Sequence, residues 1–326
     1  MEVSRKTTLW LIKGILALAA LFYLIKGLHW KLLYASLLAI RPFWALMALG
    51  LVGVNLGLEA YKWHRMLLHV APNTRYREAL GAMLSGYALG FFTPARLGDY
   101  AGRVLFLTYP RKGEIAALTF AERMLNLTCY LGIGLIALTY FLLTTLELPP
   151  FTWYTVLSVS AFGFIALLTL ILHPRLAHTV LSTLIPIKQI QNWLTFLNRF
   201  NTRDAHYLLA LSALRYAVFS TQFFLLILAF QENAPVFESY TGIFLVFFAK
   251  SAIPSFTMMD LGIREGASVF FLGQLGISEV AAFNAAFLLF CINILLPAGI
   301  GIPFLFKLHL EILRKPIATI KRSADA

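Results

Sequence analysis

Long apolar runs separated by short polar intervals organise this chain from end to end. Six of the runs are clear, and each is long enough to cross about 30 Å of hydrocarbon as a helix rising about 1.5 Å per residue. They are residues 9–25, 43–61, 115–146, 151–172, 207–230 and 280–306. Recurring runs of this length are typical of polytopic helical membrane proteins, so the pattern predicts six spanning helices from these runs alone.

Two further apolar stretches are broken by proline and then resume as a second short apolar piece. The paired pieces are 79–95 with 104–109, and 241–259 with 267–277. Pro94 ends the first stretch, and Pro254 interrupts the second. Each stretch forms either a simple crossing or a unit that returns to its starting side, as a re-entrant hairpin or as two short crossings.

The distribution of Lys and Arg decides between these topologies. If both stretches simply crossed, the basic residues outside the membrane segments would divide 11 cytoplasmic against 12 external, whereas two returning units give 17 against 3. The 17 are Arg5, Lys6, Lys62, Arg65, Arg75, Arg77, Arg111, Lys112, Arg175, Lys188, Arg199, Arg203, Lys307, Arg314, Lys315, Lys321 and Arg322, and the three exceptions are Lys26, Lys31 and Arg41. The positive-inside rule selects the returning units and places both termini in the cytoplasm.

This topology gives the two halves of the chain the same element order in opposite orientations. Pro94 and Pro254 are 160 residues apart, and the starts of the next long helices are 165 apart. Interrupted apolar segments at matching places in inverted halves point to a transporter's binding site. The predicted fold is an all-α polytopic membrane protein with about eight membrane segments and two inverted-topology repeats, each with a re-entrant or broken-helix hairpin. The expected divisions are one transmembrane domain over 1–326, halves at about 1–146 and 151–310, a cytoplasmic loop at about 173–206 and a basic tail at 307–326.

Composition agrees with a membrane protein and excludes several other classes. The chain has 60% hydrophobic and 13% charged residues, whereas soluble domains are about a quarter charged. We therefore read the net charge of +12 as topology and lipid contact, and expect no nucleic-acid partner. The two cysteines lie in apolar runs, and the seven histidines are scattered. No H-E-x-x-H, G-x-S-x-G or P-loop signature occurs, so we expect no metal, cofactor or enzymatic activity.

Charged residues follow the proline of the first interrupted stretch. Arg96, Asp99 and Arg103 are spaced i, i+3, i+7, so they share one face of a helix that begins after Pro94. Gly98 leaves room for a close approach. One interpretation is a structural ion pair whose arginines reach lipid phosphate. The other is the wall of a polar cavity that binds a charged headgroup, because ionisable residues at membrane depth usually mark a pathway.

The second interrupted stretch and the long helix after the first one carry further charges. Asp260 and Arg264 are spaced i, i+4 beside Gly262 and Glu265, which fits either a self-neutralising pair or a binding site. The neighbours Glu122 and Arg123 point about 100° apart on a helix and need different partners. We expect a network linking Glu122 to the first interrupted stretch. Weaker candidates are Lys250 and Arg215.

These segments resemble the flippase-like family typified by the membrane domain of lysylphosphatidylglycerol synthases. That family has a Pro-x-Arg-x-Gly-Glu-x-x-x-Arg segment, a Glu-Arg pair in the next helix and a late Gly-x-Arg-Glu segment. The corresponding residues are Pro94-Ala95-Arg96-Leu97-Gly98-Asp99 with Arg103, Glu122-Arg123, and Leu261-Gly262-Ile263-Arg264-Glu265. Asp99 stands where the family commonly has Glu, and Ser255 to Asp260 replace a stretch that is usually richer in Gly.

The resemblance implies movement of a polar-headed lipid or lipid-linked molecule between leaflets of the cell membrane. The implied headgroup site comprises Arg96, Asp99, Arg103, Glu122, Arg123, Asp260, Arg264 and Glu265, with the hairpins broken at Pro94, Gly98, Pro254 and Gly262. About 20 residues follow the last predicted helix, so we expect no aminoacyl-transferase domain. The expected partners are membrane lipids with an anionic or phosphate-bearing headgroup. The alternatives are an intramembrane enzyme acting on headgroups and a scaffold for a separate lipid-modifying enzyme, and the sequence leaves homo-oligomerisation open.

Overall fold

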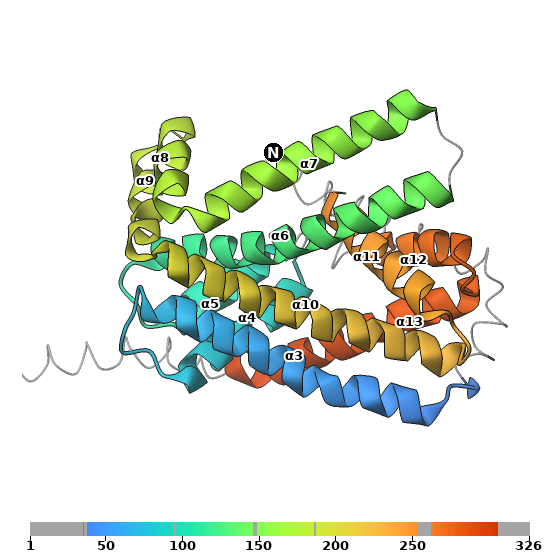
Figure 1. The fold of residues 1–326 in the computed structure, drawn as a ribbon. Coiled ribbons are helices and arrows are strands. Elements are labelled where there is room, and N and C mark those ends of the chain that lie inside the picture. Colours follow the sequence, from blue (N-terminus) through green and yellow to red (C-terminus); the bar gives the residue numbers. More distant parts are fainter. Residues whose placement is uncertain are drawn as a thin grey trace, which may run out of the picture.

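The computed structural model describes residues 35, 38–93, 96–145, 149–185, 187–252 and 262–305, and all regular structure in these ranges is helical (Figure 1). Five helical stretches are long and apolar enough to cross a membrane. They are α3 (Pro42–Leu68), α6 (Lys112–Thr144), Phe151–Leu172 of α7 (Pro150–Leu172), α10 (Thr202–Phe230), and Glu279–Leu305, which contains α13 (Glu279–Phe290) and the π-helical turn η2 (Cys291–Leu295). The prediction of an all-helical, multi-pass membrane protein is confirmed. The predicted span 9–25 lies outside the described residues, and the total of eight segments stays a prediction.

Each interrupted stretch forms a pair of shorter helices packed against each other. The first hairpin is α4 (Tyr76–Phe91) with α5 (Leu97–Phe106), and the second hairpin is α11 (Val236–Ala252) with α12 (Ile263–Gln274). In the first hairpin Gly81 abuts Phe106 while Gly90 abuts Asp99, which is the pattern of two antiparallel helices. The chain therefore returns towards the end of the bundle from which α4 started.

Glycines let the two helices of the first hairpin approach backbone to backbone. A Cβ at Gly102 would lie 2.5 Å from the carbonyl oxygen of Ser85, and one at Gly98 would lie 2.2 Å from that of Leu89. Both distances are far below van der Waals contact, so a side chain at either position would force the helices apart. The Gly98 N–H also donates to Oγ1 of Thr93 over 2.6 Å, which closes the tip of the hairpin.

The hairpins open towards opposite ends of the bundle. At one end Nε2 of His69, after α3, lies 3.2 Å from Oδ2 of Asp204 in the first turn of α10. At the other end Arg41 pairs with Glu232, between α10 and α11. The first hairpin opens at the end marked by His69 and Asp204, and the second hairpin opens at the end marked by Arg41 and Glu232 (Figure 1). Helices α3 and α10 run side by side in opposite directions.

The two halves share a further backbone detail. Arg96, the N-cap of α5, has φ 53°, and Gly262, the N-cap of α12, has φ 91°. Positive φ is ordinary for glycine and uncommon for other residues, so Arg96 holds a strained backbone conformation. The order helix, hairpin, helix recurs as α3, α4/α5, α6 and as α10, α11/α12, α13. Structural equivalence of the two halves stays a prediction.

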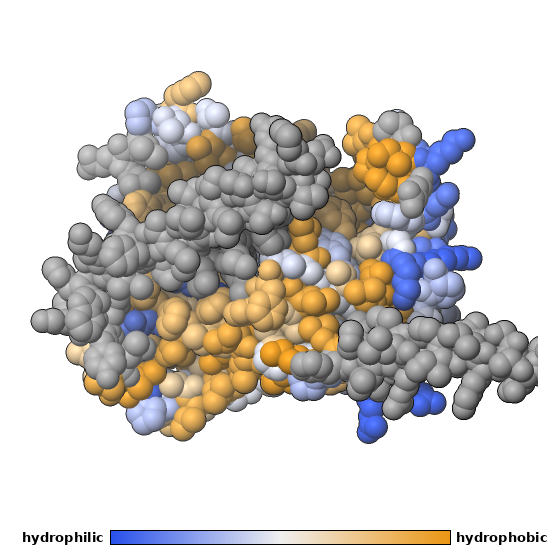
Figure 2. Space-filling model, turned by 180° about the vertical axis from the view of Figure 1, so that it is seen from behind, coloured by the Kyte–Doolittle hydropathy of each residue, from blue (hydrophilic) through white to orange (hydrophobic). Residues whose placement is uncertain are grey.

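Basic side chains gather at one end. The residues at this basic end are Arg65, Arg75, Arg77, Arg111, Lys112, Arg175, Lys188, Arg199 and Arg203. At the opposite end, the described residues include a single Lys or Arg, which is Arg41. In Figure 2 apolar side chains make up most of the central surface that is not grey, and polar ones collect at the basic end, on the right of that view. One assignment was wrong. Lys62 does not lie outside the membrane segments, because its side chain is fully buried in the bundle.

The predicted polar loop at 173–206 is largely helical. It contains α8 (Pro174–Leu184), α9 (Lys188–Leu194) and the 3₁₀ helix η1 (Thr195–Arg199), here called the helical lobe. Leu194, Phe196 and Phe200 are buried in or beside this lobe. Phe196 and Phe200 belong to the apolar cluster of the bundle, so the lobe is anchored against it.

The buried apolar residues form separate clusters, and the larger ones include residues from both halves of the chain. One cluster centres on Trp63, Met83 and Ile115, and another on Phe223 and Phe247. By contrast, the apolar window of α7 has no buried residue. In a bilayer that surface faces acyl chains, which accept it without cost.

Candidate functional site

A polar cavity of about 320 Å³ lies where the tips of the two hairpins meet the long helices. We call it the central cavity. It is lined by residues of α3, both hairpins, α6, α10 and η2, and its ionisable lining residues are Glu59, Arg96, Asp99, Arg103, Glu122, Arg123, Arg215, Lys250 and Arg264. Segments far apart in the sequence thus build one polar site inside an apolar bundle.

Cations outnumber carboxylates in this cavity. Six of the ionisable lining residues are Arg or Lys and three are Asp or Glu. Lys62 and Glu265 pair with lining residues and add one charge of each sign. The described part of the site therefore has a formal excess of three positive charges. Excess charge at membrane depth is costly, and an anion that enters the cavity lowers that cost.

Glu59 of α3 joins three other helices. Its Oε2 accepts a 2.6 Å hydrogen bond from Tyr87 of α4 and lies 2.8 Å from Nη2 of Arg215 in α10. Its Oε1 lies 3.6 Å from Nη2 of Arg103 in α5. Glu59 is 4% exposed, so these charges interact out of contact with bulk water. The carboxylate fixes the first hairpin against α3 and α10.

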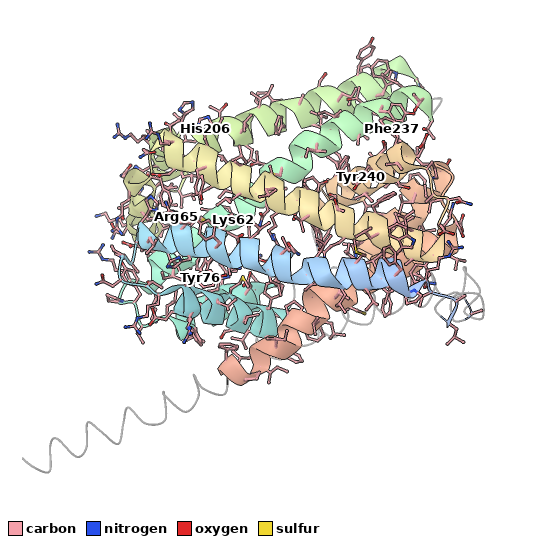
Figure 3. All side chains as sticks on the ribbon, turned by 60° about the horizontal axis from the view of Figure 1, so that its bottom comes forward. Lys62, Arg65, Tyr76, His206, Phe237 and Tyr240 are labelled. Atoms are coloured by element: carbon pink, nitrogen blue, oxygen red, sulfur yellow. The ribbon has the colours of Figure 1, made fainter. Side chains whose placement is uncertain are left out.

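Lys62, one turn further along α3, is fully bonded. Its Nζ lies 2.8 Å from Oε1 of Glu122 and donates to Oδ1 of Asn126 at 2.7 Å and to Oγ of Ser212 at 3.0 Å. An ammonium has three donors, and each has an acceptor here. Figure 3 shows Lys62 within the bundle, farther from the basic end than Arg65. Lys62 therefore ties α3 to α6 and α10.

Asp99 and Glu122 hold the arginines of the first hairpin. Asp99 Oδ1 lies 2.9 Å from Nε of Arg103, one helical turn away, and Oδ2 lies 3.1 Å from Nη2 of Arg123 in α6. Glu122 Oε2 lies 3.5 Å from Nη1 of Arg103. The predicted link between Glu122 and the first hairpin is therefore present, and the adjacent Glu122 and Arg123 do have different partners.

Arg96 lines the cavity from a backbone position that the residue spacing did not predict. The helix begins at Leu97, so Arg96 is its N-cap and does not continue the helical face of Asp99 and Arg103. Its guanidinium instead lies 4.8 Å from the centre of the Tyr87 ring. The Arg96 carbonyl accepts a 2.9 Å hydrogen bond from Nη2 of Arg123, which holds the strained backbone in place.

The second hairpin contributes Arg264. Its Nη2 lies 2.6 Å from Oε1 of Glu265, and its guanidinium carbon lies 5.5 Å from the centre of the Phe290 ring. Glu265 Oε2 accepts the N–H of Gly262 at 2.8 Å, so Glu265 both caps α12 and holds the arginine. The described pairing of Arg264 is with Glu265. The predicted partner Asp260 lies outside the described residues, as do Pro94 and Pro254.

Some buried donors of the cavity arginines have no acceptor. Nε of Arg215 and Nε of Arg264 make no hydrogen bond to any part of the chain that the structure describes. Buried N–H groups are nearly always paired, with protein, water or ligand. Several arginines line this cavity, whose described residues carry an excess of positive charge, and such a site suits an oxyanion.

Two amides link the halves beside the cavity. Nδ2 of Asn55 in α3 donates to Oδ1 of Asn293 in η2 over 2.7 Å, and both side chains are buried. Asn293 lies in the π-helical turn, which interrupts the regular helix, and such turns often occur at functional sites.

Several residues of this network were not predicted from the sequence. Glu59 is a charge inside the predicted run 43–61, which was a usable signal, whereas Lys62 had been assigned to the surface. Arg215 was ranked as weak but pairs with Glu59 in the interior. Tyr87 had no signal, because a tyrosine in an apolar stretch is unremarkable by itself. Within the described residues there is no group of three His, Cys, Asp or Glu side chains that could hold a metal ion.

The chain matches a known family over most of its length. The family model described as "Lysylphosphatidylglycerol synthase TM region" matches residues 10–301 of the 326. The matched region includes both hairpins and every residue of the central cavity. No curated protein matches the chain.

Proposed function

The chain belongs to the family of the lysylphosphatidylglycerol synthase transmembrane region, and from this premise we propose that it is a flippase that moves an anionic, phosphate-bearing lipid between membrane leaflets. Family membership supports a membrane protein related to lipid handling. The charge of the central cavity supports the narrower assignment to an anionic headgroup.

The observation that carries the proposal is the cationic central cavity at the tips of both hairpins. Arg96 from the first hairpin and Arg264 from the second line the same cavity. A guanidinium binds two phosphate oxygens at once, which a lysine ammonium does not. In the proposed cycle the headgroup occupies this cavity while its acyl chains stay in the bilayer. Asp99, Glu122 and Glu265 hold the arginines in position.

The hairpins suit access from both leaflets. They open towards opposite ends of the bundle and meet at the cavity, as in transporters built from inverted repeats (Figure 1). The positive-inside rule assigns the basic end, and with it both termini, to the cytoplasm. On this proposal the protein resides in the cell's inner or plasma membrane.

The cavity carboxylates favour transport over catalysis. A general base needs a carboxylate that is available to take a proton from the substrate. Glu59, Asp99 and Glu122 each lie within 3.6 Å of at least two cationic side chains. Their oxygens are therefore already engaged in holding cationic side chains in position. This supports a transporter over an intramembrane enzyme, and it is neutral towards a scaffold.

The proposal is tested in proteoliposomes that contain headgroup- or chain-labelled phospholipids. Dithionite bleaches fluorophores in the outer leaflet, so lipid brought outwards by the protein is bleached as well. We expect labelled phosphatidylglycerol to be bleached beyond the outer-leaflet fraction, and labelled phosphatidylcholine several-fold more slowly. Mass spectrometry of the recovered lipid should show no chemical change. Headgroup turnover would favour an enzyme, and bleaching equal to protein-free liposomes would exclude a flippase.

A further inference from the structure

A second cavity lies apart from the central cavity, at the basic end. It encloses about 220 Å³ between α6, α7, α10 and the helical lobe, and its exposed lining is almost wholly carbon. Representative lining residues are Phe120 of α6, Leu170 of α7, Ala177 of α8 and Phe196 of η1. We call it the apolar pocket. Its walls include α6 and α7, two candidate spanning helices that follow each other in the sequence. The apolar window of α7 has no buried residue.

The apolar pocket suits a hydrocarbon chain better than water or a protein segment. An engineered apolar cavity of about 150 Å³ stays dry and binds benzene, so a larger apolar cavity accepts part of an acyl chain. A helix with its side chains is about 10 Å across and does not fit this volume. The pocket adjoins α7, whose apolar window has no buried residue and is therefore free to contact acyl chains in a bilayer.

Another cavity adjoins the apolar pocket. It encloses about 490 Å³, and Pro174 and Phe200 line both cavities. Its other lining residues include Arg175, in the first turn of α8, and Arg203, in the first turn of α10. We call it the basic mouth.

The two arginines of the basic mouth differ from their neighbours in having no carboxylate partner. Arg111 and Arg199 at the same end both pair with Glu114. In the described part of the chain the guanidinium groups of Arg175 and Arg203 form no ion pair or hydrogen bond, and both side chains are exposed. They therefore present two positive charges beside an apolar pocket, which is the complement of an anionic amphiphile.

We propose that the apolar pocket and the basic mouth together form a second lipid site, which holds an anionic phospholipid with one acyl chain in the pocket and its phosphate at Arg175 and Arg203. The site is separate from the transport cavity. Within the part of the chain that the structure describes, Met124 of α6 is the one residue that lines both the apolar pocket and the central cavity, so it lies between them. A lipid held here fastens the helical lobe and α7 to α6 and α10.

The test is photocrosslinking in nanodiscs with phosphatidylglycerol that carries a diazirine in one acyl chain. Peptide mapping should place crosslinks in α6, the end of α7, α8 and η1. Phosphatidylcholine with the same acyl chain should crosslink there several-fold less. Inorganic phosphate in excess should not displace the lipid, since the acyl chain contributes to binding; displacement by phosphate would point to a simple anion site.

Variants test the pocket and the mouth separately. Ala177→Phe should fill the pocket and abolish the mapped crosslinks, whereas Thr179→Phe, exposed on the same helix, should not. The double variant Arg175→Gln, Arg203→Gln should lower crosslinking at least five-fold. Removal of two exposed charges elsewhere at the basic end, Arg77→Gln with Lys188→Gln, should leave it unchanged.

The outcomes separate this proposal from the flippase proposal. Arg264→Gln in the central cavity should leave these crosslinks intact. If this variant lost them, the acyl chain in the apolar pocket would belong to the transported lipid. The second site would be overturned if phosphatidylglycerol and phosphatidylcholine crosslinked to it equally. It would also be overturned if the Arg175/Arg203 double variant crosslinked to phosphatidylglycerol as strongly as wild type does. If Ala177→Phe does not fold, an excess of unlabelled phosphatidylglycerol replaces it as the competitor, and crosslinks that resist this excess would also overturn the site.

Discussion

Breaking the buried pair between Lys62 and Glu122 tests whether the charge network holds the bundle together. Lys62 is 0% exposed and Glu122 2% exposed, and their charged atoms lie 2.8 Å apart. Lys62→Met removes the cation and also the donors to Asn126 and Ser212. Glu122 then keeps a 3.2 Å hydrogen bond from Asn126 and the more distant Arg103.

The expected loss is large because one partner of a buried pair remains charged. Removing one member typically costs about 3–5 kcal/mol, whereas replacing both by neutral groups is often close to neutral. Lys62→Met and Glu122→Gln should each destabilise the protein by about that amount, and the double variant by clearly less than the sum. At about 2–4 °C per kcal/mol, the single variants should melt on the order of 10 °C lower.

The assay is thermal unfolding of the purified protein in detergent, followed by intrinsic fluorescence. Lys188→Met is the matched control, because Lys188 is exposed on α9 and its loss should change stability by less than about 0.5 kcal/mol. Single variants that melt with wild type, or a double variant whose loss equals the sum of the singles, would refute a coupled buried pair.

Three further predictions concern the hairpin, the site and the topology. In a melting experiment Gly102→Ala should destabilise the protein by at least about 1–3 kcal/mol, because a Cβ there would lie 2.5 Å from a backbone oxygen. The control Gly53→Ala should be neutral or slightly stabilising, because a Cβ at Gly53 would have no atom within 4 Å. Asp99→Asn should lower flipping in proteoliposomes more than it lowers the melting temperature, and Asp99→Glu should remain active; an Asn variant that flips like wild type would remove Asp99 from the site. Single cysteines at Asn73 and Glu232, in a background without the two native cysteines, should label from the cytoplasmic and external sides respectively; labelling of both from one side would contradict the topology.

Apolar periodicity and charge bias predicted much of the fold. Run length alone located α3, α6, α7, α10 and the α13–η2 segment, because a bilayer fixes how long a spanning helix must be. The positions of Pro94 and Pro254 located both hairpins, and the described basic residues do gather at one end. The helical lobe escaped prediction because short apolar patches become helix only when a neighbouring surface covers them.

The site was predicted in part, and the failures have physical causes. Asp99 and Arg103 were found because an i, i+4 spacing fixes their contact within one helix. Glu59 and Arg215 meet across 156 positions, so no local pattern connects them. Lys62 was misplaced because a charge count cannot tell a lysine at a helix end from one turned into the bundle. Arg96 was misplaced because its positive φ depends on the hairpin tip.

The central claim is that an anionic headgroup passes through the cavity at the hairpin tips, and the flipping rate of labelled phosphatidylglycerol in proteoliposomes tests it most directly. The proteins to compare are wild type, Arg96→Leu, Arg264→Leu, Arg264→Lys and the surface control Arg77→Leu, each shown to be folded by its melting curve. The account predicts near-complete loss in both cavity Leu variants, partial activity with Lys because the bidentate fork is lost, and wild-type rates in the control. Wild-type rates in both folded cavity Leu variants would contradict it.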